Sequence, residues 1–137
     1  MLQRLHSEHG ILIEIDALVS QAFSGQREDL DEMLGNLLDN ACKWAKSRVR
    51  IEARIDPLAD SRTALRVTVD DDGPGIAEAD RARVLMRGGR ADEATPGHGL
   101  GLAMVHDTVE LYGGSLRIDA SRLGGAHFEL RLPGRDS

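Results

Sequence analysis

Three groups of residues in this 137-residue chain have types and spacings that could support chemistry. The first lies at 67–76, where the strand-like run Val-Thr-Val leads into three aspartates and a Gly-Pro-Gly turn. Glycine permits close approach of a ligand to the backbone, and proline stiffens the turn. A carboxylate at a strand end can accept a hydrogen bond from the exocyclic amine of a heterocycle such as adenine. An ordinary solvated turn has the same composition, so the rest of the chain must decide.

The second group lies on a segment of helical periodicity at 26–46. Placed at 100° per residue, its apolar residues fall on one broad arc. Beside that arc runs a narrow polar stripe of Glu32, Asn36, Asn40 and Lys43. Amide oxygens suit a hard cation such as Mg²⁺, which shares phosphate oxygens, and the lysine can neutralise a phosphate. Taken alone, the stripe fits either a metal–phosphate surface beside the core or an ordinary solvated helix face.

The third group is Gly-His-Gly-Leu-Gly-Leu at 97–102, which runs into a predicted helix ending near Tyr112. Glycine-rich backbone at a helix start offers unpaired N–H groups and a favourable dipole to an anion. Residues 86–98 show no periodicity and contain Arg87 and Arg90. An irregular loop of this length is usually functional, and two guanidinium groups suit a lid over a triphosphate. The alternative is a flexible surface loop whose arginines face water. The Rossmann, P-loop and protein-kinase signatures are absent.

The elements that must position these groups follow from the pattern. We expect strands at 11–18, 48–55, 63–70, 115–120 and 126–132, with Leu-Gly-Gly at 123–125 joining the last two as a hairpin. We expect helices at 26–46, at 78–85 and after the third glycine group. This order predicts an α/β (α+β) two-layer sandwich, with a mixed, mostly antiparallel sheet of about five strands covered on one face by three helices. Residues 1–9 are interpreted as the remnant of a preceding helical segment, and 10–137 as the domain.

Composition narrows the class of protein. The length is enough for one domain with a core. A net charge of −6 argues against broad nucleic-acid binding. The single cysteine, Cys42, excludes an intramolecular disulfide framework and fits a reducing compartment. No apolar run approaches the length of a membrane span.

In this order, the three groups resemble the N, G1 and G2 boxes of the Bergerat-fold (GHKL) ATPases, which include gyrase, heat-shock chaperone, mismatch-repair and histidine-kinase domains. The N box is carried by Glu-Met-Leu-Gly-Asn-Leu-Leu-Asp-Asn-Ala-Cys-Lys-Trp at 32–44, G1 by Asp-Asp-Gly-Pro-Gly at 71–75, and G2 by 97–102. The amino-acid sequences of the N and G1 boxes are most similar to those of bacterial sensor histidine kinases of the PhoQ type. The resemblance covers nearly the whole chain, roughly 10–132.

The resemblance implies ATP and Mg²⁺ as ligands and phosphoryl transfer as the chemistry. Asp71 would accept from the adenine amino group, Gly73 and Gly75 would shape that wall, and Asn36 would ligand Mg²⁺. The residues implied in catalysis are Glu32, Asn36, Lys43 and Arg90. Those implied in nucleotide binding are Asn36, Asn40, Lys43, Trp44, Asp71, Gly73, Gly75, Ile76, Arg87, Arg90, His98, Gly99, Leu100, Gly101 and Leu102.

The sequence departs from the family pattern in two places. The phenylalanine that often opens the lid region is replaced by Leu85-Met86. A phosphoacceptor histidine in a His-Glu-x-x-x-Pro context is missing, since His6 and His9 lack that context. We therefore expect the catalytic and ATP-binding domain of a longer kinase, cytoplasmic and belonging to an inner-membrane sensor.

The expected partners are the dimerisation and histidine-phosphotransfer domain of the parent kinase and, indirectly, a response regulator, but no nucleic acid. The isolated domain is expected to be a monomer and the parent a homodimer. Three alternatives stay open: a free-standing anti-sigma-factor-type protein serine kinase, an ATP hydrolase in which Glu32 acts as general base for water, and a non-enzymatic nucleotide-binding module.

Overall fold

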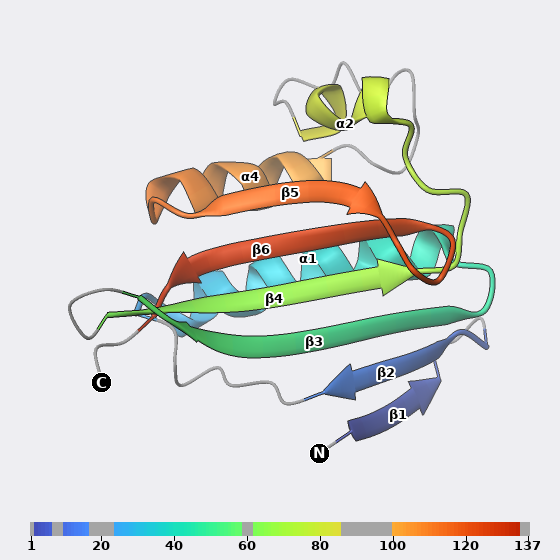
Figure 1. Cartoon of the computed structure of the whole chain (residues 1–137), viewed down its shortest axis with the longest axis horizontal. Coiled ribbons are helices and arrows are strands. Elements are labelled where there is room, and N and C mark those ends of the chain that lie inside the picture. Colours follow the sequence, from blue (N-terminus) through green and yellow to red (C-terminus); the bar gives the residue numbers. More distant parts are fainter. Residues whose placement is uncertain (1, 7–9, 17–23, 59–61, 86–99, 135–137) are drawn as a thin grey trace.

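A six-stranded sheet in the order β1-β2-β3-β4-β6-β5 forms one layer of the molecule (Figure 1). The computed structural model describes residues 2–6, 10–16, 24–58, 62–85 and 100–134. The strands are β1 Leu2–His6, β2 Leu12–Asp16, β3 Arg48–Pro57, β4 Thr63–Asp71, β5 Ser115–Ala120 and β6 Ala126–Pro133. β2 pairs with β3 in parallel and the other neighbours are antiparallel. The predicted mixed, mostly antiparallel sheet is therefore confirmed.

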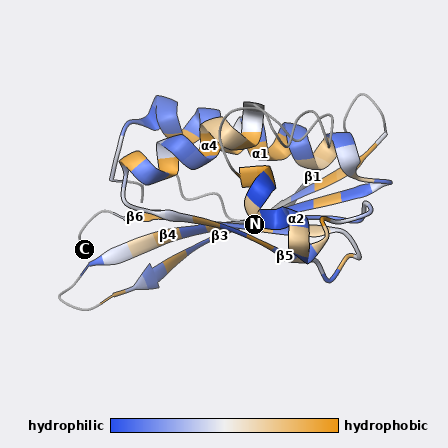
Figure 2. Ribbon diagram, turned by 90° about the horizontal axis from the view of Figure 1, so that it is seen from above, coloured by the Kyte–Doolittle hydropathy of each residue, from blue (hydrophilic) through white to orange (hydrophobic). Residues whose placement is uncertain are grey.

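Three helices among the described residues complete the fold: α1 Arg27–Trp44, α2 Glu78–Leu85 and α4 Leu100–Leu111. Figure 2 shows α1 and α4 together over one face of the sheet, where they pack side by side. None of these helices is long and apolar enough to cross a membrane. The α/β two-layer sandwich predicted from the sequence is confirmed.

Strict alternation along the central strands builds the core. On β4 and β6, and on β3 as far as Ala53, every second residue is buried against the helices, as expected for a sheet covered on one face. The buried series on β4 is Leu65, Val67, Val69 and finally Asp71. The core is mostly aliphatic, with Phe128 fully buried among these side chains. The alternation thus carries a carboxylate, at the end of β4, to the side of the sheet that faces the helices.

The opposite face of the sheet, here called the outer face, carries paired charges. Arg66 and Arg131 both contact Asp56, at 3.0 and 2.9 Å, and Arg117 lies 3.6 Å from Glu129. This face can be exposed to solvent without a second layer of helices, because its side chains are charged and each lies beside a partner of opposite sign.

The interpretation of residues 1–9 as helical is wrong for Leu2–His6, which form β1 and pair antiparallel with β2. An isolated helix of so few residues is marginal in water, whereas the edge of β2 offers backbone hydrogen bonds to a short extended segment. This strand raises the sheet from about five strands to six. The domain boundary placed at residue 10 stays a prediction.

Candidate nucleotide-binding site

Asp71 is the most buried charged group described in the chain, with 2% of its surface exposed. Its Oδ1 accepts hydrogen bonds from the backbone N–H groups of Gly73 at 2.9 Å and Ala126 at 3.2 Å. Its backbone carbonyl accepts from the N–H of Gly125 at 3.0 Å. Among the described residues both side-chain bonds fall on Oδ1, so Oδ2 is the oxygen left to accept from a ligand.

The electrostatic environment of Asp71 favours a donor at that oxygen. Burial raises the pKa of its carboxyl, the N–H groups of Gly73 and Ala126 act in the opposite direction, and the charges of Asp72 and Asp70 raise it further. The net direction is upward, which means that the buried carboxylate is incompletely compensated by the protein. An amine that donates to Oδ2 would supply part of the missing compensation.

Two glycines lie beside this carboxylate, and their Cα atoms are so close to neighbouring atoms that a residue with a Cβ would not fit. A Cβ on Gly73 would collide with the carbonyl oxygen of Trp44, and one on Gly125 would collide with Oδ1 of Asp71. Gly75 adopts a φ of +75° and lies against the carbonyl of Gly125. The turn after β4, the end of α1 and the β5–β6 hairpin therefore meet around Asp71 at van der Waals contact.

Gly125 and Ala126 were missed in the sequence analysis, which treated 123–125 only as a hairpin connection. The structure separates two roles in that doublet, because Gly124 supplies the positive φ of +106° while Gly125 supplies the close approach to Asp71. The hairpin turn needs only one glycine with a positive φ. The second glycine in the sequence was therefore a sign that the backbone approaches another group closely at this point.

The three consecutive aspartates have three different functions, and Asp72 fixes the connection between α1 and β3. Its Oδ1 accepts from the backbone N–H groups of Lys46, Ser47 and Arg48 at 2.8, 3.0 and 3.1 Å, and Oδ2 accepts from the Ser47 hydroxyl at 2.7 Å. Burial acts to raise the pKa of Asp72, but these hydrogen bonds outweigh it and lower the pKa to about 2. Asp72 thus holds the G1 turn against the end of α1.

The polar stripe on α1 connects Asp71 to the start of α4. Oδ1 of Asn36 lies 3.7 Å from the position of a Cβ on Gly101, in the first turn of α4. Eight residues later on the same helix, the carbonyl of Trp44 touches Gly73. At a rise of 1.5 Å per residue these two contacts are about 12 Å apart. The stretch of α1 from Asn36 to Trp44, which carries Asn40 and Lys43 of the stripe, therefore runs from a helix N-terminus, which attracts anions, to the carboxylate cradle.

The predicted site residues divide by their surroundings. Asn40 is buried at 7% exposure, while Glu32 and Lys43 are exposed on α1. Ile76 is partly buried against the core, and the side chain of Leu102 belongs to the core at 1% exposure. Leu102 can therefore serve a ligand only through its backbone. Arg87, Arg90, His98 and Gly99 lie outside the described residues, as does the side chain of Leu100.

The donor set around Asn36 fits Mg²⁺ only as a shared ion. Its amide oxygen is a hard donor beside a helix N-terminus. In the part of the chain that the structure describes, no group of three or more His, Cys, Asp or Glu side chains could hold a metal by itself. A metal ion at Asn36 would need phosphate and water oxygens for its remaining ligands, which is the usual arrangement for Mg²⁺.

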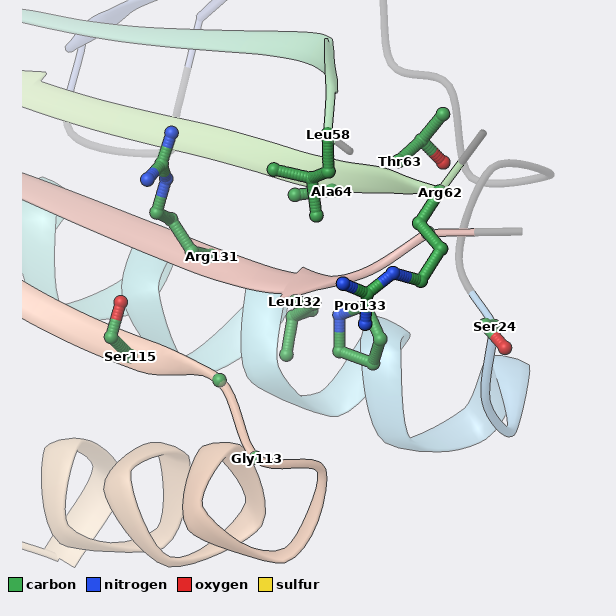
Figure 3. Close-up of a pocket in the computed structure, with 12 residues that line it drawn as sticks. Ser24, Leu58, Arg62, Thr63, Ala64, Gly113, Ser115, Arg131, Leu132 and Pro133 are labelled. Atoms are coloured by element: carbon green, nitrogen blue, oxygen red, sulfur yellow. The ribbon is translucent and has the colours of Figure 1, made fainter. Parts of the chain in front are cut away.

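A separate hollow of about 560 Å³ lies at the other end of β4 (Figure 3). It is lined by Thr63 and Ala64 at the start of β4, by Ser115 of β5 and by Arg131 of β6. Because Asp71 is the last residue of β4, this hollow is distinct from the carboxylate cradle.

Comparison with known proteins agrees with this geometry. Residues 25–136 match the family described as histidine kinase-, DNA gyrase B-, and HSP90-like ATPase. The chain belongs to this family. Sensor protein kinase CarS of Pseudomonas aeruginosa is 46% identical over 132 residues, which are 96% of this chain and 28% of CarS. Two-component sensor PhoQ of the same organism is 40% identical over 131 residues, 96% of this chain and 28% of PhoQ.

A solved structure described as the ATP binding domain of PrrB from Mycobacterium tuberculosis superposes with a TM-score of 0.61 at 26% identity, covering 92% of this chain and 74% of that one. The resemblance to PhoQ-type kinases is confirmed, and the chain is the counterpart of their catalytic ATP-binding domain. It spans little more than a quarter of the curated relatives that it matches.

Proposed function

We propose that this chain binds ATP along the polar stripe of α1 and transfers the γ-phosphate to a histidine on a dimerisation and phosphotransfer domain outside the chain. The single observation that supports this is the arrangement of the stripe. Next to Lys43, the last residue of the stripe, the backbone carbonyl of Trp44 lies against Gly73 beside a buried carboxylate, and Asn36 of the stripe lies against Gly101 at a helix N-terminus. A ligand with an aminated heterocycle at one end and phosphates at the other matches this order of groups.

In this proposal Asp71 accepts from the adenine amine through Oδ2, and the glycines around it exclude side chains from the adenine plane. The first turn of α4 presents backbone N–H groups to phosphate, and Lys43 adds a positive charge. Asn36 is the residue that would hold Mg²⁺, which neutralises phosphate charge when it is bound. Arg87 and Arg90, outside the described residues, stay candidates for contact with the γ-phosphate.

The role of the protein in the transfer is positioning and charge stabilisation. The acceptor domain, the response regulator that it would serve and a cytoplasmic location in an inner-membrane sensor are parts of the same proposal. They are supported by the similarity to sensor kinases, of which this chain covers only the catalytic part. Glu32 is exposed on α1 and is assigned no separate role in the transfer.

The test uses the chain together with a separate acceptor. The purified chain is incubated with Mg²⁺ and γ-labelled ATP, alone and with the dimerisation and phosphotransfer domain of CarS, whose catalytic part is 46% identical to this chain. We expect label on the acceptor only, in an acid-labile and alkali-stable form, because phosphohistidine contains a P–N bond. An acceptor with its phosphoacceptor histidine changed to glutamine is the control and should stay unlabelled.

Other outcomes would refute the proposal in identifiable ways. Acid-stable label on a protein serine would favour the serine-kinase alternative. Release of inorganic phosphate at the same rate with and without the acceptor would favour an ATP hydrolase. No label and no phosphate release, together with no ATP binding, would remove the enzyme assignment altogether.

A further inference from the structure

A row of alternating charges crosses the outer face of the sheet directly behind the nucleotide site. The strand register places Arg50 of β3 opposite Asp70 of β4, Asp70 opposite His127 of β6, and His127 opposite Asp119 of β5. His127 Nδ1 lies 2.7 Å from Asp70 Oδ1, and the two side chains are 26% and 18% exposed. This half-buried pair faces away from the helices, on the side of the sheet that the proposed nucleotide does not touch.

This pair is also the last register pair between β4 and β6. The next residues along both strands are Asp71 and Ala126, whose N–H donates to Oδ1 of Asp71. Gly125 follows, and its Cα approaches Asp71 so closely that a Cβ would collide with Oδ1. Any change in the spacing of the two strands at the Asp70–His127 pair is therefore passed on, within one residue, to the carboxylate cradle.

We propose that the Asp70–His127 pair is a positioning clamp for Asp71, and that protonation of His127 tightens nucleotide binding. The proposal deepens the proposed function and rests on it, since the clamp acts through the carboxylate assigned to adenine. Histidine side chains generally change charge between about pH 5 and 8, whereas carboxylates and arginines keep theirs. Protonated His127 makes a charge-assisted hydrogen bond to Asp70, and neutral His127 makes a weaker one.

Other charged groups face this pair from every element of the outer face. Asp119 flanks His127 on the β5 side, and a hollow that contains the pair is lined by further charged side chains from β3, β4 and the β5–β6 turn. The charged groups around His127 are Arg50, Glu52, Arg66, Asp70, Asp119, Arg122 and Glu129. Asp119 itself lies 3.4 Å from Arg117 of β5 and 3.9 Å from Arg81 of α2. Because carboxylates stand opposite His127 on both neighbouring strands, the positive imidazolium completes the alternation of the row and the neutral ring interrupts it.

The test measures affinity for a non-hydrolysable ATP analogue with Mg²⁺ by calorimetry from pH 5.5 to 8.5, for wild type, His127→Gln and Asp70→Asn. We expect the wild type to bind about two- to five-fold tighter than either variant at the acid end of this range, and its difference from His127→Gln to shrink as the pH rises. The double variant should lose no more than the single ones, because both remove the same interaction. His106, a half-exposed histidine 3.3 Å from Glu110 on α4, supplies the matched control. His106→Gln should keep the wild-type profile.

A second readout needs no nucleotide. The amide resonances of Gly73 and Ala126, which donate to Asp71, should shift with pH between 5.5 and 8.5 in the wild type and stay constant in His127→Gln. The urea midpoint of each protein is measured at the same pH values. Titrations common to all proteins, including those of the nucleotide and of His98, cancel in the comparison.

The outcomes separate the two claims. If the affinities of wild type and His127→Gln depend on pH in the same way, the clamp is overturned. It is also overturned if the two affinities differ only at pH values where the urea midpoints differ by a corresponding amount. If the wild type binds no analogue at any pH while the Gly73 and Ala126 resonances still follow His127, the clamp on Asp71 stands and the proposed function fails.

Discussion

Replacing Asp71 by asparagine tests the carboxylate cradle most directly, because the structure restricts how the new amide can sit. Oδ1 receives two backbone N–H groups, from Gly73 and Ala126, and Oδ2 is assigned to the ligand. Asparagine has one oxygen for these two positions. If the amide oxygen stays at the Oδ1 position, the NH₂ group faces the adenine amine, donor against donor. Loss of a hydrogen bond to a charged group costs about 1.5–3 kcal/mol, so the affinity should fall about 10- to 150-fold.

If the amide instead turns over, its NH₂ group faces the two backbone donors. Each buried donor left without an acceptor costs about 1–3 kcal/mol, so the free energy of unfolding should fall instead of the affinity. Either orientation predicts a loss, and the two losses are measured separately, by calorimetric titration with an ATP analogue and Mg²⁺ and by urea denaturation.

Asp31→Asn is the matched control, because Asp31 is 62% exposed on α1 and lies 3.9 Å from Arg27. It should change neither quantity by more than about 0.5 kcal/mol. Unchanged affinity together with an unchanged urea midpoint in Asp71→Asn would refute the assignment of Asp71.

Three further predictions follow from the site. Gly125→Ala should weaken nucleotide binding at least ten-fold and lower the free energy of unfolding by about 1–3 kcal/mol, because the new Cβ collides with the Asp71 carboxylate. Gly35→Ala is the control, since Gly35 faces open space on α1. This variant should bind nucleotide normally and be about 0.5–1 kcal/mol more stable. For Asp72 the pKa is lowered from 3.8 to about 2, so its contribution to stability is present above pH 4 and is lost as the pH falls toward 2; the urea midpoints of wild type and Asp72→Asn should therefore converge over that range. Asn36→Ala should fold normally but lose the Mg²⁺ dependence of analogue binding in calorimetry.

Each of these three predictions has an outcome that would contradict it. Normal binding by Gly125→Ala would mean that the β5–β6 hairpin is not part of the site. A constant difference between the Asp72 proteins down to pH 2 would assign the low pKa to other groups. Undiminished Mg²⁺ dependence in Asn36→Ala would remove Asn36 as the metal ligand, and an unfolded variant would make it structural.

Long, strongly periodic elements could be predicted from the sequence almost to their ends. The helix expected at 26–46 is observed as Arg27–Trp44. Its apolar arc extends over five turns, so the pattern alone decides where it lies. The segment at 1–9 was too short for its periodicity to decide, and the free edge of β2 determined its structure as β1.

The candidate site could be predicted only where its residues are adjacent in sequence. Asp71 and Gly73 belong to one short motif, whereas Ala126 reaches Asp71 from 55 residues away. That contact depends on the pairing of β4 with β6, which no local pattern specifies. The separate location of Asp70 was nevertheless within reach, because the period of two that places Val69 and Asp71 in the core places Asp70 on the other face.

The outer face of the sheet bears on how such a domain could work within a larger protein. Arg66 and Arg131 share Asp56, and Arg117 lies beside Glu129, so each of these arginines already has a carboxylate partner within the sheet. A surface of this kind gains little free energy by adhering to another one, since each new ion pair would replace an existing one. A domain with such a face is suited to brief contacts with another protein surface, because its outer face contributes little free energy to a stable docked state.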